Sequence, residues 1–307
     1  MKTKQKTFSV IIPTYARPIM LKSCLRSLAR IDYPREDFEV VVVDDGSTTP
    51  LDSIVNPFRG SLDLVLLTQP NQGPATARNN GAMKAKGRFL AFTDDDCEPA
   101  PDWLLSLAGR MHKAPGNAVG GRTINILTDN MYAAASQMLV DYLYRYYNKD
   151  HNRAVFFTSN NLCLPADLFW SVGGFDTTFP LPAAEDRELC ARWLRQGYTM
   201  IYAPEVLVRH SHRMTYGSFC RQHFRYGRGA FHFHRRRADA ENEATGIEPL
   251  RFYLDLLSYP FSQPGLLRPL TLASLLFVSQ TANAAGFFLQ AFSEKKVCGK
   301  HNGASRA

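Results

Sequence analysis

The sequence lacks the features that mark several classes of protein. No two of its six cysteines have the C-x-x-C spacing typical of a structural zinc site. It contains no internal repeat and no low-complexity tract. Of its 307 residues, 45% are hydrophobic and only 21% are charged, as in ordinary folded proteins. These features exclude intrinsic disorder, collagen and a small disulfide scaffold as descriptions of the whole chain.

A hydrophobic segment of the length needed for secretion is absent from the start of the sequence. Residues 1–7 are polar and basic, and the apolar run at 8–13 is too short for the core of a signal peptide. The cysteines are scattered through apolar segments, which favours buried thiols in a reducing compartment. We therefore expect the folded part of the chain to lie in the cytoplasm.

Acidic residues are fewer than basic residues, 28 against 36, so that the net charge is +8. This excess suits nucleic acid, an anionic membrane surface or a phosphorylated substrate, and the charge alone does not choose between them. At about 150 residues per domain, the length corresponds to two domains or to one large α/β domain with additions.

Short apolar runs alternate with helical patterns in the first third of the chain. Strands are predicted over 8–13, 38–43, 62–67 and 88–93, and helices over 17–30 and 74–86. This alternation predicts an α/β fold in which helices cover both faces of a parallel sheet. The later sequence predicts a helix over 130–147, a strand within 155–164, a helix over 186–196, two short strands within 199–210, a basic helix over 216–237 and an acidic linker over 238–249.

Polar side chains follow three of the predicted strands, at the point where each strand ends. They are Pro13-Thr14-Tyr15 after the first strand, Asp44-Asp45-Gly46-Ser47 after the second and Asp94-Asp95-Asp96 after the fourth. Each group alone could be an ordinary turn. Because open α/β sheets bind ligands at the carboxyl ends of their strands, the three groups together predict a binding site at that edge.

The three adjacent carboxylates of Asp94, Asp95 and Asp96 are the sharpest local signal. They repel one another unless a cation lies among them, and hard divalent cations prefer such oxygen ligands. In an extended segment Asp94 and Asp96 would point the same way and Asp95 the opposite way. We therefore expect the outer two to share one site, with Asp95 serving structure; a solvated acidic turn is the alternative.

The segment 71–81 predicts a turn that leads into a helix. Gly73 allows close approach of a ligand, Pro74 suits the first helical position, and Arg78 would project from the first turns. An arginine there can bind diphosphate oxygens with two parallel hydrogen bonds, or can form a surface ion pair.

Taken in order, these motifs resemble those of the family 2 glycosyltransferases with a GT-A fold. The matching motifs are Ser9-Val-Ile-Ile-Pro-Thr-Tyr15, Val43-Asp-Asp-Gly-Ser47, Asn71-x-Gly73 with Ala77-Arg78-Asn79-x-Gly81, and Phe92-Thr-Asp-Asp-Asp96. The resemblance covers about 8–235. It implies a doubly wound mixed sheet with helices on both faces. It also implies inverting transfer of a sugar from a nucleoside diphosphate sugar, with UDP preferred, to a hydroxyl acceptor, with Mn²⁺ or Mg²⁺ as cofactor.

The resemblance also implies a role for each matching position. Nucleotide-sugar contacts fall to Pro13, Thr14, Tyr15, Arg17, Asp44, Asp45, Arg78, Asp94 and Asp95. Metal binding falls to Asp96, which His210 or His212 would join. The general base is Asp186, and the acceptor and diphosphate side includes Glu185, Gln222, Arg225 and the loop Gly173-Gly174-Phe175-Asp176. The segment from Gln222 to Tyr226 resembles the Gln-x-x-Arg-Trp motif of processive members, with Tyr in place of Trp. Several of these residues also have ordinary structural roles, such as acids that complement a helix dipole.

The segment 270–292 contains no charged residue and is long enough to span a bilayer. Polar residues dilute it, so a buried or amphipathic helix is the alternative. Basic residues at 235–237 and at 295–296 could anchor it at lipid headgroups. We expect a catalytic domain over 1–235, with a nucleotide-binding half at about 8–115 and an acceptor half at about 116–235. The remaining 236–307 would be a linker and a helical, membrane-associated segment.

Two other functions, nucleotidyl transfer and nucleic-acid binding, fit the sequence less well than glycosyl transfer. A nucleotidyltransferase would need a glycine-rich basic loop after the first strand, and residues 13–18 contain no glycine. A basic nucleic-acid-binding module would spread its positive charge over a continuous face with exposed aromatics. Here eight of the Lys and Arg residues fall within 209–237, and the acidic strand ends would repel phosphates unless a metal ion is bound. The sequence therefore favours a nucleotide-sugar donor and a glycan or lipid-linked acceptor, and no nucleic acid.

Overall fold

The computed structural model describes residues 5–179, 183–241, 248–263 and 268–303, with the side chains of 239–241 and 295–303 left aside. Its contacts divide the chain into two compact units. The first unit comprises Met1–Ile126, Leu143–Thr177 and Asp186–His212, and the second comprises Leu127–Tyr142, Thr178–Glu185 and Arg213–Ala307. The domain boundary that the sequence places near residue 235 stays a prediction.

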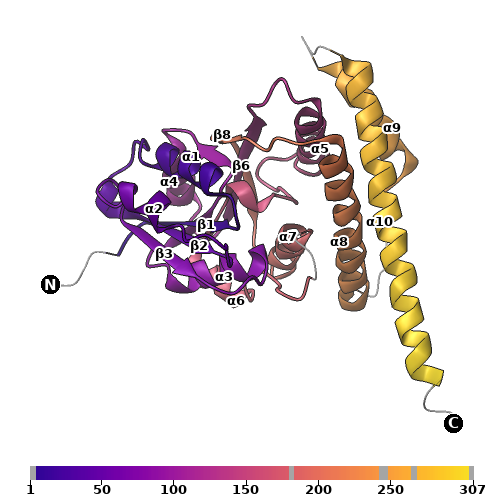
Figure 1. Ribbon diagram of the computed structural model, residues 1–307, viewed down its shortest axis with the longest axis horizontal. Helices are drawn as coiled ribbons and strands as arrows, with labels where there is room; N and C mark the ends of the chain where they lie inside the picture. Colours follow the sequence, from indigo (N-terminus) through magenta and orange to yellow (C-terminus); the bar gives the residue numbers. More distant parts are fainter. Residues whose placement is uncertain (1–4, 180–182, 242–247, 264–267, 304–307) are drawn as a thin grey trace. The chain divides into compact units, whose positions relative to one another are not determined.

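All described strands belong to one sheet in the first unit. They are β1 (Phe8–Thr14), β2 (Phe38–Asp44), β3 (Leu64–Thr68), β4 (Phe89–Phe92), β5 (Cys97–Pro99), β6 (Ala118–Asn125), β7 (Leu162–Pro165) and β8 (Met200–His210). Their order in the sheet is β3-β2-β1-β4-β7-β6-β8-β5. The strands β3, β2, β1 and β4 pair in parallel, and β3, β2 and β1 lie side by side in Figure 1, whereas β7 is antiparallel to both of its neighbours. The predicted mixed sheet is confirmed.

The described helices include those predicted over 17–30, 74–86, 130–147, 186–196, 216–237 and 270–292, together with others that the sequence pattern did not predict. They are α1 (Pro18–Leu28), α2 (Asp52–Val55), α3 (Pro74–Lys84), α4 (Trp103–Lys113), α5 (Met131–Tyr147), α6 (Ala166–Ser171), α7 (Glu185–Arg195), α8 (Tyr216–Glu241), α9 (Leu250–Ser258) and α10 (Pro269–Gly303). Four short 3₁₀ helices are η1 (Arg35–Asp37), η2 (Asn56–Phe58), η3 (Ser159–Asn161) and η4 (Tyr259–Ser262). Helix α8 continues past its predicted end at 237, and residues 242–247 of the predicted linker lie outside the described residues.

The alternation of side chains along β1 and β2 explains why helices cover both faces of the sheet. Val10 and Val40 belong to the core cluster that also includes the apolar residues of α1 and α4. Ile11 and Val43 point to the other face and meet α3. A methyl group added at Gly81 of α3 would lie 2.6 Å from Ile11 Cγ2, so the helix packs closely on the strand.

The cysteines agree with the prediction of reduced thiols. The buried free thiols are Cys24, Cys97, Cys163 and Cys190, and Cys220 is half-buried. The side chain of Cys298 lies outside the described residues. Burial raises the pKa of the Cys163 thiol well above its usual value, so this group stays protonated and unreactive.

The segment 199–210 differs from its prediction as two short strands. It forms the single strand β8, which pairs with β6 in parallel and with β5 in antiparallel orientation. The register with β6 shifts between Gly121 and Arg122, where β8 has extra residues around Pro204. Proline cannot donate to the ladder, and the irregular register at this point accommodates it within the strand.

Two long helices of the second unit, α8 and α10, run alongside each other (Figure 1). One face of α8 packs closely on α10, because an added Cβ at Gly227 would collide with the backbone oxygen of Asn283. A Cβ at Gly286 of α10 would in turn collide with the backbone oxygen of Phe224. The rings of Phe231 and Phe287 meet in an edge-to-face contact at 5.5 Å between centroids.

Within the described part of the chain, one stretch of α10 is long and apolar enough to cross a bilayer. It is Pro269–Glu294, with a mean hydropathy of 1.4, and 28% of its most apolar window is buried. Such a helix is weak evidence for a membrane span, because core helices of soluble proteins meet the same criteria. The flanking Lys295 and Lys296 fall among the side chains that are not described.

The close contact of α8 with α10 predicts different effects of two glycine substitutions on the stability of the protein. Gly286→Ala places a methyl group against the Phe224 carbonyl and should lower the free energy of unfolding by about 1–3 kcal/mol. Gly217 is exposed and has no atom within 4 Å of an added Cβ, so Gly217→Ala should change stability by less than about 1 kcal/mol. Thermal unfolding followed by circular dichroism compares the two, and equal stabilities would contradict the packing.

Candidate functional site

The register of the sheet brings the polar strand ends together at one edge. Thr14 of β1 lies opposite Asp44 of β2, and Ile11 lies opposite Phe92, the last residue of β4. The residues that follow β4 therefore reach the end of β1. The hydroxyl of Thr14 donates a 2.7 Å hydrogen bond to Oδ2 of Asp95. The predicted convergence of the strand ends is present in the structure.

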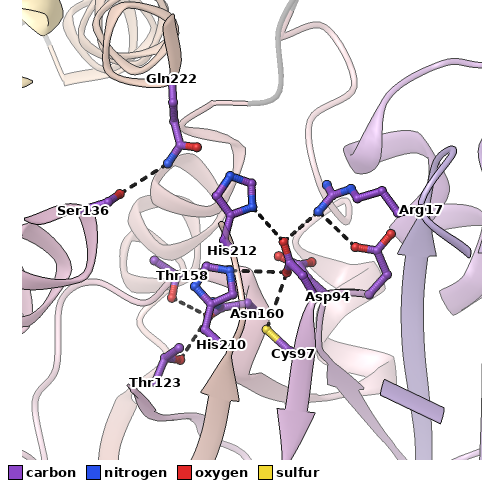
Figure 2. Close-up of polar contacts among 12 residues, drawn as sticks. Arg17, Asp94, Cys97, Thr123, Ser136, Thr158, Asn160, His210, His212 and Gln222 are labelled. Atoms are coloured by element: carbon purple, nitrogen blue, oxygen red, sulfur yellow. Dashed lines mark hydrogen bonds and ion pairs between the residues drawn. The ribbon is translucent and has the colours of Figure 1, made fainter. Parts of the chain in front are cut away.

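A carboxylate and two imidazoles form a compact group at this edge. Because β8 pairs with β5 so that His210 lies opposite Cys97, the end of β8 comes beside Asp96. Nε2 of His210 lies 3.3 Å from Oδ1 of Asp96, and Nδ1 of His212 lies 3.1 Å from Oδ2. Figure 2 shows both imidazoles and the guanidinium of Arg17 turned toward the same acidic turn. The sequence left open which histidine joins Asp96, and in the structure both of them lie beside it.

This group has the composition of a divalent metal site. The ligand atoms of Asp96, His210 and His212 all lie within 4.8 Å of one another. One carboxylate oxygen and two imidazole nitrogens are ligands that first-row divalent ions accept. Asp96 is buried and the two histidines are half-buried. The residues therefore fit a divalent cation.

Hydrogen bonds and charge, rather than burial, set the protonation of this group. Burial alone would raise the pKa of Asp96, but hydrogen bonds from His210 and His212 and the charge of Arg17 hold it well below its usual range. Burial would likewise lower the pKa of His210, but the Asp96 carboxylate raises it. Without a cation, the structure thus favours an imidazolium paired with a carboxylate.

Arg17, which precedes α1, is shared between two of the three acids. Its Nη1 lies 2.6 Å from Oδ2 of Asp96 and 3.2 Å from Oδ1 of Asp95. Burial raises the pKa of Asp95 to about 7, although the positive charge of Arg17 opposes this rise. About half of the Arg17 side chain is exposed, so its guanidinium is accessible from solvent.

The expected orientation of the three acids is wrong. Residues Asp95 and Asp96 form a turn rather than an extended segment, and the amide of Cys97 donates to the carbonyl of Asp94 at 3.1 Å. As a result Asp95 and Asp96 share Arg17, whereas Asp94 turns to Arg78. A turn breaks the alternation of side chains that the prediction assumed.

Arg78 of α3 forms a buried ion pair rather than a surface one. Its Nη2 lies 2.8 Å from Oδ1 of Asp94, and its guanidinium packs over the ring of Phe175 at 5.5 Å from the centroid. The next residue, Asn79, exchanges two hydrogen bonds with the backbone of Phe175, at 2.8 and 2.9 Å. The loop that contains Gly173 and Gly174 is therefore fixed beside Arg78.

Asp44 and Asp45 use their carboxylates to shape the loops beside the strand ends. Asp44 accepts hydrogen bonds from the amide and hydroxyl of Ser47. Asp45 accepts from the side chain of Gln69 and from the amides of Gln72 and Gly73. These partners order the loop that leads into α3, so any contact of either acid with a nucleotide base stays a prediction.

The remaining candidate residues are spread over both units. Asp186 is half-buried at the start of α7 in the first unit, and its carboxylate accepts the amide of Arg187 at 2.7 Å. Glu185 is buried and belongs to the second unit, as do the two candidates on α8. There the side-chain amide of Gln222 donates to the hydroxyls of Ser136 and Tyr226, and Arg225 is exposed. Their roles stay predictions, as do those of buried Pro13 and half-exposed Tyr15.

Sequence reasoning missed several residues that hold the site in place. Gln69 bonds both Asp45 and Asn80, but an isolated glutamine after a strand carries no recognisable signal. Ser47 belongs to the predicted polar strand end, but its bond to Asp44 was not predicted, although Asp-x-x-Ser is a common turn in which the aspartate accepts the serine amide. Arg192 of α7 donates to the carbonyls of Val172 and Gly174, and so ties α7 to the glycine loop.

Comparison with known proteins identifies the family. A model described as glycosyl transferase family 2 matches residues 9–170, and one described as glycosyl transferase family group 2 matches residues 90–292. The chain belongs to the glycosyl transferase family 2. It is 32% identical over 225 residues to validoxylamine A glucosyltransferase of Streptomyces hygroscopicus subsp. jinggangensis, a match that covers 64% of this chain and 53% of that protein. The chain therefore spans about half the length of this relative.

Solved structures share the fold. The mannosyltransferase PcManGT from Pyrobaculum calidifontis, in complex with GDP-Man and Mn²⁺, has a TM-score of 0.63 and 21% identity, and the match covers 92% of this chain and 88% of that one. S. aureus TarS 1–349 in complex with UDP-GlcNAc has a TM-score of 0.56 and 16% identity, covering 94% and 92%. These similarities confirm the GT-A fold.

The pairing of Asp96 with His210 predicts the pH dependence of metal binding. A metal ligand must be a neutral imidazole, so binding releases a proton wherever His210 is charged. Mn²⁺ affinity should therefore rise with pH, by about tenfold per pH unit below the raised pKa of His210, and level off above it. Titration calorimetry over a pH series measures this.

The stability of the metal-free protein should show the opposite trend. The folded pKa of His210 is raised above its ordinary value of 6.5, so the contribution of the pair is fully present below 6.5 and is lost as pH rises through the folded pKa. The variant His210→Gln tests the metal assignment. It should weaken Mn²⁺ binding and reduce the dependence of Mn²⁺ affinity on pH. An affinity that does not change with pH would contradict the assignment of His210 as a ligand.

Proposed function

We propose that this chain is a metal-dependent, inverting glycosyltransferase that moves a sugar from a nucleoside diphosphate sugar to a hydroxyl acceptor. The observation that carries the proposal is the group of Asp96, His210 and His212 at the carboxyl ends of the strands. Membership of glycosyl transferase family 2 supports the reaction class. The neighbours in complex with GDP-Man and Mn²⁺ and with UDP-GlcNAc support a nucleotide-sugar donor, and we propose UDP as its nucleotide.

The Asp96 group would hold a divalent cation, Mn²⁺ or Mg²⁺. When bound, such a cation supplies positive charge that stabilises the departing diphosphate. Asp96 is already ionised in this structure, since its neighbours lower its pKa, and the two histidines must give up any proton that they hold. The site is therefore prepared to exchange a bound proton for a metal ion.

Arginines add positive charge around the same edge. Arg17 is half-exposed beside Asp95 and Asp96, so it can reach a diphosphate while it remains near the acids. Arg78 is buried against Asp94, which fixes the direction of its guanidinium. Preorganised charge of this kind stabilises a leaving group without reorganisation during the reaction. We propose Arg225 of α8 as a further contributor on the acceptor side.

Asp186 is proposed as the general base. It would take the proton from the acceptor hydroxyl as the oxygen attacks the anomeric carbon from the face opposite the leaving diphosphate, which inverts that centre. Helix α7 is held in place through Arg192, which bonds the Gly174 carbonyl at 2.8 Å and pairs with Glu188 at 2.5 Å. The adjacent Phe175 packs on Arg78, so a chain of contacts connects α7 with the acids after β4.

We further propose that the acceptor is a hydroxyl of an envelope glycan or a lipid-linked glycan at the cytoplasmic membrane. The apolar segment 270–292 supports this assignment, because it gives the chain a means of contact with lipid. The catalytic residues would then work on the cytoplasmic side, where nucleotide sugars are made.

A thermal-shift panel tests the donor and the metal together. UDP-, GDP- and dTDP-sugars are added with and without Mn²⁺, because a ligand that binds only the folded state raises the unfolding temperature. We expect UDP-sugars with Mn²⁺ to stabilise the protein, by roughly 2.7 kcal/mol at a ligand concentration of 100 Kd. Asp96→Asn should remove the Mn²⁺-dependent part of the shift. Stabilisation by no nucleotide sugar would contradict the proposed function.

The base assignment predicts a separation of binding from chemistry. Asp186→Asn keeps a side chain of similar size but cannot accept a proton, so donor-induced stabilisation should persist while transfer falls by about 10²–10⁴-fold. Asp102→Asn, at an exposed aspartate just before α4 and outside the candidate site, is the matched control and should retain most activity. Unchanged turnover in Asp186→Asn would exclude Asp186 as the base.

A further inference from the structure

The outer face of α10 carries a continuous stripe of exposed apolar residues. Leu270, Phe277, Phe288 and Phe292 have 71%, 61%, 52% and 62% of their surface exposed. Their spacings of seven, eleven and four residues are close to whole numbers of helical turns, which places them on one side of the helix. We call these four residues the apolar stripe. Exposed aromatic side chains in this number are unusual on a helix that faces only water.

Two polar residues between these positions use their hydroxyl protons in hydrogen bonds within the helix. Ser274 and Thr281 lie on the same side of the helix and are exposed. The hydroxyl of Ser274 donates to the carbonyl of Leu270 at 2.9 Å, and that of Thr281 donates to the carbonyl of Phe277 at 3.0 Å. Back-bonding of this kind satisfies the hydroxyl within the helix. The face is therefore suited to a medium of low polarity.

The opposite side of α10 is fixed to α8. Gly227 and Gly286 allow the two backbones to approach closely, and Nε of Arg228 donates to Oε1 of Gln290 at 2.8 Å. Helix α8 would thus accompany α10 into a bilayer. Its arginines make this costly, since a charged side chain at the bilayer centre is strongly unfavourable. The packing argues against α10 as a lone membrane span.

The charge of α8 suits an anionic surface. Helix α8 contains six arginines and only two acidic residues, Asp239 and Glu241, which lie at its C-terminal end. Arg221, Arg225, Arg228 and Arg235 lie along one side of the helix, adjacent to its contact with α10. Arg221 and Arg225 are exposed. Basic residues beside an apolar surface are attracted to anionic lipid headgroups, by roughly 1 kcal/mol per residue near the surface.

We propose that the second unit lies on an anionic membrane surface through the apolar stripe of α10, rather than crossing the bilayer. Leu254 of α9 and Phe261 of η4 are further exposed apolar residues of the second unit. This inference deepens the membrane contact of the proposed function. Its test measures lipid binding without a transfer reaction, so either proposal can fail alone.

Flotation with vesicles tests the proposal. Full-length protein is mixed with phosphatidylcholine vesicles, alone or with phosphatidylglycerol, and is centrifuged through a density gradient. We expect it to float with the anionic vesicles and less with the neutral ones. The double variant Phe277→Ser, Phe288→Ser should lose affinity for the vesicles by roughly tenfold or more, because it lacks two aromatic side chains that the lipid would bury.

A matched control removes exposed apolar residues from the first unit. Met83 and Leu105 are 65% and 54% exposed, so Met83→Ser with Leu105→Ser makes a similar change in surface polarity. This control should float like the wild type. Circular dichroism and the donor-induced thermal shift of both double variants should match those of the wild type, which shows that the folds and the transfer site are intact.

Four results would overturn the proposal. The first is a wild-type protein that does not float, and the second is a stripe variant that floats as well as the wild type. The third is a wild-type dimer in sedimentation experiments that the stripe variant converts to a monomer, because a second copy would then cover the stripe. The fourth is failure of bound protein to move from labelled to unlabelled vesicles, because a surface-bound helix exchanges whereas a spanning helix does not.

Discussion

The buried carboxylates at the end of β4 require positive partners, and the rest of the site is arranged to supply them. An ionised carboxylate out of water is strongly unfavourable unless it is paired and hydrogen-bonded. Arg78 from α3 pairs with Asp94, and Arg17 before α1 pairs with both Asp95 and Asp96. The histidines at the end of β8 contact Asp96 as well. Because these partners come from separate elements, the sheet order and the site depend on each other.

The two units also differ in the charge and polarity of their functional residues. The acids that could bind a cation belong to the first unit, whereas the arginines of α8 and the apolar stripe of α10 belong to the second. The net charge of +8 therefore does not describe a uniform basic surface. It reflects an acidic site for a metal and a phosphorylated donor, together with a basic and apolar helical pair that suits anionic lipid.

Local patterns predicted much of the fold, because strand and helix periods are properties of neighbouring residues. The run 8–13, the strand ends with their acidic residues and the helix over 74–86 were all recognisable, whereas His210 and His212 were suggested by the family resemblance. The turn at Asp95, the shared use of Arg17 and the continuity of β8 through Pro204 were not. They depend on contacts between segments far apart in the sequence. The family resemblance, rather than any spacing, suggested Asp186.

The most direct test of the central claim is the position of a bound metal ion. Crystals grown with Mn²⁺ and UDP, and measured at a wavelength where manganese scatters anomalously, should show one peak in contact with the carboxylate of Asp96 and with at least one imidazole of His210 or His212. A peak elsewhere in the molecule, or UDP bound at the strand ends with no peak near Asp96, would contradict the account.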